Sequence, residues 1–170
     1  LLVTATATVF VGTLYPLALE GLTGDKISVG APYYNMTFVP LMIPLLLALP
    51  AGPLLAWKRG DIMGVMQRLF FAALAAVAAA LTTFAFAHEF SLAPFGMALG
   101  VWVMAGAVSE WLLRIKAGSA GLQEVARRAR NLPRSAYGTL LAHFGVGLMV
   151  VGIVGTTAYR EEHGLLMKPG

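Results

Sequence analysis

The chain has no cysteine among its 170 residues, which excludes a disulfide, a thiolate metal site and a nucleophilic thiol from this chain. It also carries little charge, because only 12% of its residues are charged, whereas roughly a quarter are charged in a typical soluble domain. Hydrophobic residues make up 58% of the chain, and several apolar runs are long enough to cross a bilayer. An ordinary soluble domain is therefore excluded, and we expect a polytopic membrane protein.

The apolar runs predict an all-α fold, a bundle of about five transmembrane helices. Each run is long enough, at about 1.5 Å per residue, to cross ~30 Å of hydrocarbon. The spans are predicted near residues 1–19, 36–57, 69–87, 92–113 and 136–158. Because the chain begins inside an apolar run without an initiator methionine, residues 1–170 are interpreted as part of a longer protein.

The basic residues predict how the spans are oriented. Nine of the twelve Lys and Arg residues fall in the connections 58–68 and 114–135. The positive-inside rule places both connections in the cytoplasm, and it places residues 20–35, 88–91 and 159–170 on the outer, periplasmic side. The net charge of +4 is thereby explained by topology, and no nucleic-acid partner is expected.

Two features mark the cytoplasmic end of the predicted bundle. Within 114–135, apolar residues recur at helical spacing beside three arginines, which predicts a short basic amphipathic helix on the surface of the lipid bilayer. Glu110 and Arg114 lie one turn apart at the end of the fourth span. An ion pair is the plainer interpretation, and a proton-handling role for Glu110 is the alternative.

The first two spans carry features that could either stabilise packing or line a transport path. Hydroxyls in the first span can bond to their own helix or form a polar path. They belong to Thr4, Thr6, Thr8 and Thr13. Prolines in the second span predict kinks, which need neighbouring helices or a cavity to satisfy the freed backbone. They are Pro40, Pro44, Pro50 and Pro53.

His143 is a polar residue inside the apolar fifth span, and its position there needs an explanation. On a helix that starts near Tyr137, it lies about 9 Å along the axis, inside the inner third of the hydrocarbon. A neutral imidazole at this depth needs a polar atom of another helix, a proton path or a metal. The residues on its face could accept a flat macrocycle, and they are Thr139, Leu140, Val146, Gly147 and Val150. A second seam, on a different side of the helix, consists of Gly138, Gly145 and Gly152.

The other two histidines do not suit the same iron. His88 and His163 follow the third and fifth spans, which places both at the outer surface, about 20 Å from His143 by helical rise. We interpret them as solvated loop residues. The sequence also lacks a P-loop, an HExxH pair and a GxSxG elbow, so these hydrolytic and phosphate-binding classes are not predicted.

Five segments, in order and over nearly the whole chain, resemble the C-terminal half of the CcmF family, the large membrane subunit of the bacterial cytochrome c haem lyase. They are GTLYPL at 12–17, KISVGAPYYN at 26–35, GPL at 52–54, EWLLR at 110–114, and YGTLLAHFGV with the following GIV at 137–154. The histidine of the family's AHxG motif falls on His143.

The resemblance implies an enzyme of the bacterial inner membrane. Such a subunit acts with other haem-lyase subunits, receives haem from a periplasmic haem chaperone, and helps to join it to the CXXCH motif of apocytochrome c. It also implies a permanent haem b, with His143 as one axial ligand of the haem iron, that could reduce the iron of the incoming haem.

Several parts of the family's pattern are absent from these 170 residues. They are the tryptophan-rich periplasmic segment, the two periplasmic haem-ligating histidines and the second membrane ligand, and His88 and His163 match no family motif. A related haem-attachment subunit for nitrite reductase is expected to share many of the motifs. A transporter half and a non-catalytic assembly subunit remain as alternative interpretations of the residues.

Overall fold

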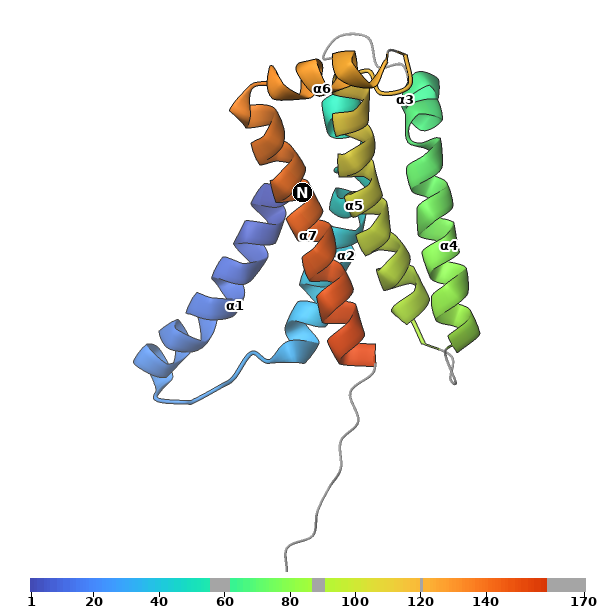
Figure 1. Ribbon diagram of the computed structural model, residues 1–170. Helices are drawn as coiled ribbons and strands as arrows, with labels where there is room; N and C mark the ends of the chain where they lie inside the picture. Colours follow the sequence, from blue (N-terminus) through green and yellow to red (C-terminus); the bar gives the residue numbers. More distant parts are fainter. Residues whose placement is uncertain (56–61, 87–90, 120, 159–170) are drawn as a thin grey trace, which may run out of the picture.

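The computed structural model describes residues 1–55, 62–86, 91–119 and 121–158, and within these residues the chain is helical without any strand. The elements are α1 Leu2–Thr23, α2 Ala31–Ala48, the short 3-10 helix η1 Gly52–Leu54, α3 Ile62–Arg68, α4 Phe70–Phe86, α5 Ala93–Arg114, α6 Leu122–Arg130 and α7 Arg134–Ala158 (Figure 1). The predicted all-α class is confirmed.

Four of the described helical segments are long and apolar enough to cross a membrane. They are α1, residues 31–54 with α2 and η1, α5 and α7. α4 is a shorter apolar helix of 17 residues. With α4 counted, the structure is consistent with the predicted bundle of about five spans, and the chain is a multi-pass membrane protein.

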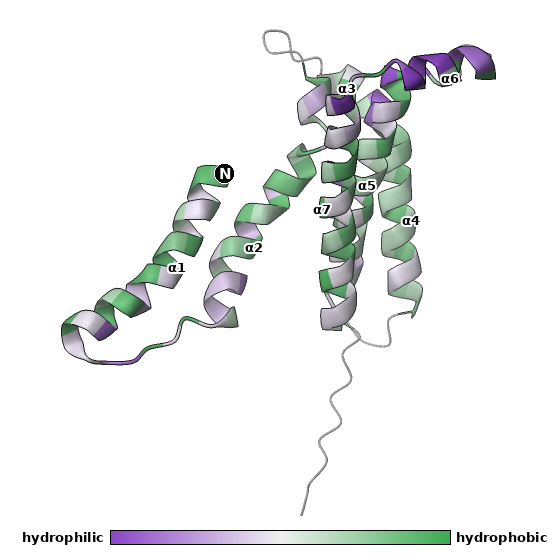
Figure 2. Ribbon diagram, turned by 60° about the vertical axis from the view of Figure 1, so that its left-hand side comes forward, coloured by the Kyte–Doolittle hydropathy of each residue, from purple (hydrophilic) through white to green (hydrophobic). Residues whose placement is uncertain are grey.

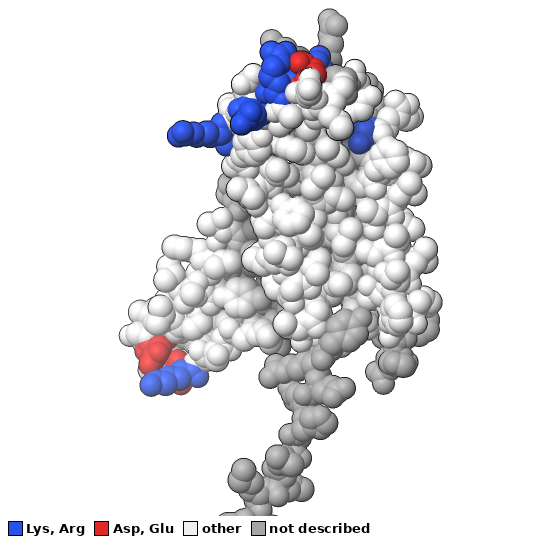
Figure 3. Space-filling model, in the orientation of Figure 1, with Lys and Arg blue, Asp and Glu red and all other residues white. Residues whose placement is uncertain are grey.

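Charged residues gather at the two ends of the bundle. On the face shown in Figure 3, an uncharged surface separates a larger, mainly basic group of charged residues at one end from a small mixed group at the other. Among the described residues, the strongly basic end carries Arg68, Arg114, Lys116, Arg127, Arg128, Arg130 and Arg134, and the other end carries Lys26. We call the first of these the basic end. This separation is typical of helices that cross hydrocarbon.

The predicted loop at 20–35 is too long. α1 continues to Thr23 and stops at Gly24, whose left-handed φ of 78° is typical of a residue that ends a helix. α2 begins at Ala31, not near residue 36, with Pro32 in its first turn. A proline is favourable there because the backbone N–H groups of the first turn have no partner within the helix, so Pro32 is compatible with the start of α2.

α2 is also shorter at its far end than predicted. Of the four prolines predicted to kink the second span, only Pro40 and Pro44 lie inside the helix, which ends at Ala48. Pro50 and Pro53 lie in the turn and the 3-10 helix that follow. α3 was not predicted from the sequence; it forms the described part of the 58–68 connection, and the buried Leu69 lies between it and α4.

α5 is the centre of the packing. It contacts α4 and α7 along much of its length, and it contacts α2 less extensively. The α1–α2 pair stands apart from α4, α5 and α7 near the 24–30 loop (Figure 2). Inside that pair, the Tyr33 hydroxyl donates a 3.0 Å hydrogen bond to the carbonyl of Thr8. The indole N–H of Trp102 on α5 donates to the carbonyl of Leu47 at 3.1 Å, which joins α2 to the rest.

Three of the four threonine hydroxyls singled out in the first span are satisfied by their own helix. Thr6, Thr8 and Thr13 donate to the carbonyls of Leu2, Thr4 and Val9, each four residues earlier. These three residues confirm the packing interpretation and give no support to a polar path along α1.

Candidate functional site

α7 positions the candidate ligand His143. The helix begins at Arg134, directly after Pro133, and its 25 residues span about 37 Å, enough to cross the hydrocarbon. His143 lies nine residues after Arg134, about 13 Å along the axis, and about 22 Å from the helix end at Ala158. The imidazole is therefore well inside the span and not at one of its ends.

The rotation of α7 is fixed by glycines that bring it close to α5. A Cβ at Gly147 would lie 2.5 Å from the Cγ of Met104 and 2.7 Å from the carbonyl oxygen of Gly100. A Cβ at Gly100 would lie 2.6 Å from Val151, and the same crowding recurs between Gly96 and Val154. None of these glycine positions has room for a side chain, so α7 cannot turn about its axis without losing the contact.

His143 lies one turn before Gly147, at the margin of the face that packs on α5. Its side chain is partly buried, and no hydrogen bond joins its imidazole to another residue in the described part of the chain. Gly147, predicted to lie on the open face of His143, is instead covered by α5. The face that remains beside the imidazole carries Thr139, Val146 and Val150.

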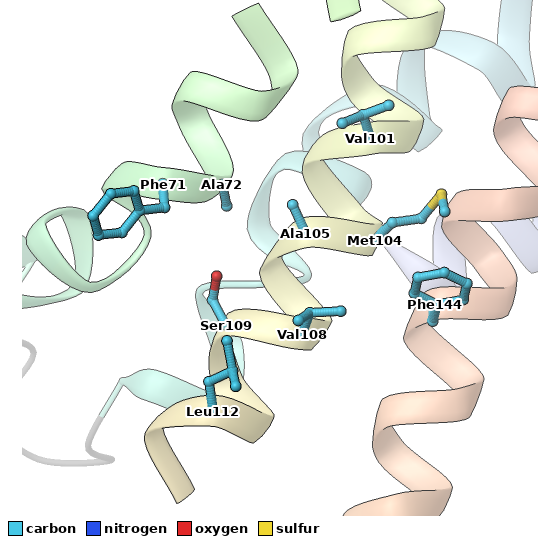
Figure 4. A pocket seen from close by; sticks show the side chains of 9 residues that line it. All are labelled: Phe71, Ala72, Val101, Met104, Ala105, Val108, Ser109, Leu112 and Phe144. Carbon is cyan, nitrogen blue, oxygen red and sulfur yellow. The ribbon is translucent and has the colours of Figure 1, made fainter. Parts of the chain in front are cut away.

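An apolar cavity of about 360 Å³ lies next to this position, between α4, α5 and α7 (Figure 4). Phe144 lines it from α7, Phe71 and Ala72 line it from α4, and the rest of the lining comes from α5. Ser109 is the one residue in this lining with a hydroxyl. His143 does not line the cavity, so its environment is separate from this space.

At the basic end, one ion pair lies within α5, and contacts of Tyr137 join α7 to α6 and α5. Arg114 donates two hydrogen bonds to Oε1 of Glu110, at 2.9 and 2.6 Å, which confirms the predicted ion pair. The Tyr137 hydroxyl donates to the carbonyl of Ala129 at 2.7 Å, and its ring lies 6.4 Å from that of Trp111. These contacts fix the start of α7, six residues before His143.

Other residues singled out in the sequence are less informative. His88 and His163 lie outside the described residues. Within the described ranges, no group of three or more His, Cys, Asp or Glu residues could hold a metal ion. The glycine seam at 138, 145 and 152 has nothing within 4 Å of any of its three Cβ positions in the described structure.

Sequence reasoning missed the seam that does pack. Gly96 and Gly100 are separated by three residues in GMALG, a small-xxx-small motif that allows close helix approach. The contact between Pro50 and Gly106 was missed as well. The spacing of residues in the sequence does not indicate that a residue of α5 packs against the turn after α2.

Comparisons with known proteins place the chain in a family, although no family model and no solved structure matches it. It is 55% identical, over its whole length, to the cytochrome c-type biogenesis protein CycK of Rhizobium meliloti. It is 37% identical over 98% of its length to CcmF of Pseudomonas aeruginosa, and 31% identical over its whole length to CcmF of Escherichia coli. The chain belongs to the CcmF family of cytochrome c-type biogenesis proteins. The aligned part is 25% of each of these three relatives, so the chain spans about a quarter of their length.

The likeness extends beyond proteins named CcmF or CycK. The cytochrome c-type biogenesis protein NrfE of Haemophilus influenzae is 25% identical over 99% of this chain, and the aligned part is again 25% of the relative. The CcmF resemblance read from the five sequence segments is thus confirmed at the level of the family.

Proposed function

We propose that this CcmF-family chain is the C-terminal membrane portion of a haem lyase subunit, which helps to attach haem to apocytochrome c. The family's name, cytochrome c-type biogenesis, supports a role in cytochrome c maturation. The proposed reaction joins haem from a periplasmic haem chaperone to the CXXCH motif of apocytochrome c, with other haem-lyase subunits as partners. Each thioether bond forms by addition of a cysteine thiol to a vinyl group of haem. The sulfur bonds to one vinyl carbon and the thiol proton goes to the other, so no net oxidation occurs.

His143 is proposed to be one axial ligand of a membrane haem b. The observation that carries this proposal is a partly buried imidazole, about 13 Å into an apolar helix, with no hydrogen-bond partner among the described residues. Leaving such a group unpartnered in hydrocarbon is costly, so a partner from outside this chain segment is expected.

The residues fit one side of a haem. A neutral imidazole supplies one ligand nitrogen, and the small or apolar neighbours Val146 and Val150 leave its side of α7 free of competing ligands. When bound, the group would supply an electron that keeps the iron of the incoming haem ferrous. The second ligand would come from another part of the longer protein. The seam at Gly147 holds α7 against α5, and thereby fixes the direction in which His143 points.

The test is a reduced-minus-oxidised optical spectrum of the purified full-length protein and its variants. His143→Ala is expected to abolish the b-type signal, and His143→Gly is expected to regain it when imidazole is added, because the free base can occupy the vacated ligand position. Thr156→Ala is the matched control on the same helix, since Thr156 lies thirteen residues from His143 and its hydroxyl bonds to the Gly152 carbonyl of its own helix, so its loss should leave the spectrum unchanged. An unchanged spectrum in His143→Ala would show that the residue is not the ligand.

The membrane is proposed to be the bacterial inner membrane, with the basic end in the cytoplasm. Because the chain has no cysteine, single cysteines can report the sidedness, in a full-length background without other cysteines. An impermeant thiol reagent added from the periplasmic side should label Asp25→Cys and spare Ser119→Cys. The reverse pattern would invert the proposed topology.

A further inference from the structure

α6 lies crosswise over the basic end of the bundle and is its most hydrophilic helix (Figures 1 and 2). The bond from the Tyr137 hydroxyl to the Ala129 carbonyl holds it against α7. Val125, Arg128 and Ala129 are partly buried, which shows that this side of α6 packs on the protein. Because α6 lies level with the ends of the spans, its other sides face the boundary between hydrocarbon and water.

The exposed side of α6 combines an apolar edge with a cation. Leu122, Ala126 and Arg130 follow one another at intervals of four, so they lie along one side of the helix. Leu122 is 89% exposed, an unusual state for a large apolar side chain in water. A helix that carries an exposed leucine next to arginine is typical of one that rests in the interfacial region of a bilayer.

The arginines of α6 and of the start of α7 fall into two groups. Arg127 and Arg128 are already engaged, since both donate to the carboxylate of Glu124 at 2.8 to 2.9 Å. Arg130 and Arg134 are exposed, and neither pairs with a carboxylate in the described part of the chain. The two guanidinium groups are therefore free to bind an anion from outside the protein, and a guanidinium suits a phosphate well.

The engagement of Arg127 and Arg128 is stable at neutral pH. Their hydrogen bonds, Arg127 first, lower the pKa of Glu124 from 4.5 to about 2, so the carboxylate stays charged. At neutral pH, Arg130 and Arg134 thus remain the arginines of α6 and of the start of α7 that are free to bind an anion, among the described residues.

From this arrangement we infer that α6 is a membrane-surface helix that binds the headgroups of anionic phospholipids through Arg130 and Arg134, with Leu122 inserted at the acyl boundary. The charge complementarity, the exposed apolar edge and the position level with the span ends all favour lipid as the occupant. This inference does not depend on the proposed haem chemistry.

The experiment uses the full-length protein in phosphatidylcholine vesicles with traces of spin-labelled phosphatidylglycerol or phosphatidylcholine. The protein-associated fraction of each spin label gives the preference for the anionic lipid. We expect a preference for phosphatidylglycerol that weakens with added salt. Arg130→Gln and Arg134→Gln should each lower it by up to about fivefold, the factor that corresponds to one basic residue near a charged surface.

Two controls separate headgroup binding from general effects. Lys26→Gln makes the same change in net charge at the opposite end, where Lys26 pairs with Glu20, and should leave the preference unchanged. Glu124→Gln frees Arg127 and Arg128 and should raise the preference, a gain that a misfolded variant could not show. If the double variant at Arg130 and Arg134 keeps the full preference, or if Lys26→Gln lowers it equally, the inference is wrong and another part of the longer protein covers α6.

Discussion

Gly147 of α7 lies so close to Gly100 of α5 that a Cβ at position 147 would come within 2.7 Å of the Gly100 carbonyl oxygen. This atom belongs to the backbone of a helix and cannot move aside as a flexible side chain can. The contact fixes the rotation of α7, and this rotation determines on which side of the helix His143, the proposed ligand, lies.

The first prediction concerns this contact. Gly147→Ala should force α5 and α7 apart and lower the free energy of unfolding by about 1–3 kcal/mol, the usual cost of overpacking. The measurement is the midpoint of thermal unfolding of the full-length protein in detergent. Gly145→Ala is the matched control on the same helix, and with nothing within 4 Å it should be neutral or slightly stabilising. Equal midpoints for the two variants would contradict the close approach.

The second prediction concerns the join between the α1–α2 pair and the rest of the bundle. Gly106 on α5 faces the ring of Pro50, and a Cβ at position 106 would overlap the ring. Gly106→Ala should therefore destabilise the protein by about 1–3 kcal/mol. The same substitution combined with Pro50→Gly should be less harmful than the sum of the two single changes, because the ring that clashes has been removed. Strict additivity of the thermal shifts would show that the two positions do not touch.

The fold class and the spans could be predicted because a helix that crosses the hydrocarbon of a bilayer needs a long apolar run with few charges, and both features are visible in the sequence. Local contacts could be predicted as well: Glu110 and Arg114 are four residues apart on one helix, so spacing alone brings them together. The ends of α1 and α2 could not be predicted from composition, since Pro32 was compatible with both a loop and a first helical turn.

The packing of the site could not be predicted from α7 alone. The regular spacing of Gly138, Gly145 and Gly152 suggests a packing seam more strongly than the single Gly147 does. Which of these glycines meets a neighbouring helix depends on where α5 lies. The GMALG motif on α5 held the missing information, because only a glycine pair there matches Gly147. The position of His143 followed from the sequence, whereas its lack of a partner within the described residues needed the structure.

The third prediction concerns pH. Glu124 has its pKa lowered to about 2 by Arg127 and Arg128, from 4.5. A depressed carboxyl pKa contributes stability that is fully present above pH 4.5 and is lost as the pH falls through 2. The link between Glu124 and its arginines should therefore persist throughout the neutral and mildly acidic range. Titration of the ¹³C-labelled Glu carboxyl resonances in the full-length protein, with Glu124→Gln to assign the signal, measures this. An inflection near 4.5 would show that the arginines do not hold the carboxylate.

The fourth prediction decides between the two interpretations of Glu110. This residue is 5% exposed, its carboxylate accepts both bonds from Arg114, and Arg114 is itself 44% exposed. Arg114→Leu should leave a buried carboxylate without its partner and destabilise the protein by about 2 kcal/mol, less than for a fully buried pair because water reaches the arginine.

Replacing both residues of this pair, Glu110→Leu with Arg114→Leu, should recover most of that loss, because no uncompensated charge remains. The thermal midpoints of the single and double variants in detergent form the cycle that measures the coupling. The same proteins are then assayed for cytochrome c maturation in cells. A structural ion pair predicts that the stable double variant keeps its activity, because only the packing at the end of α5 matters. A proton-handling carboxylate predicts the opposite, loss of activity in the double variant and in Glu110→Gln despite normal thermal midpoints, since neither retains a group at position 110 that can exchange a proton.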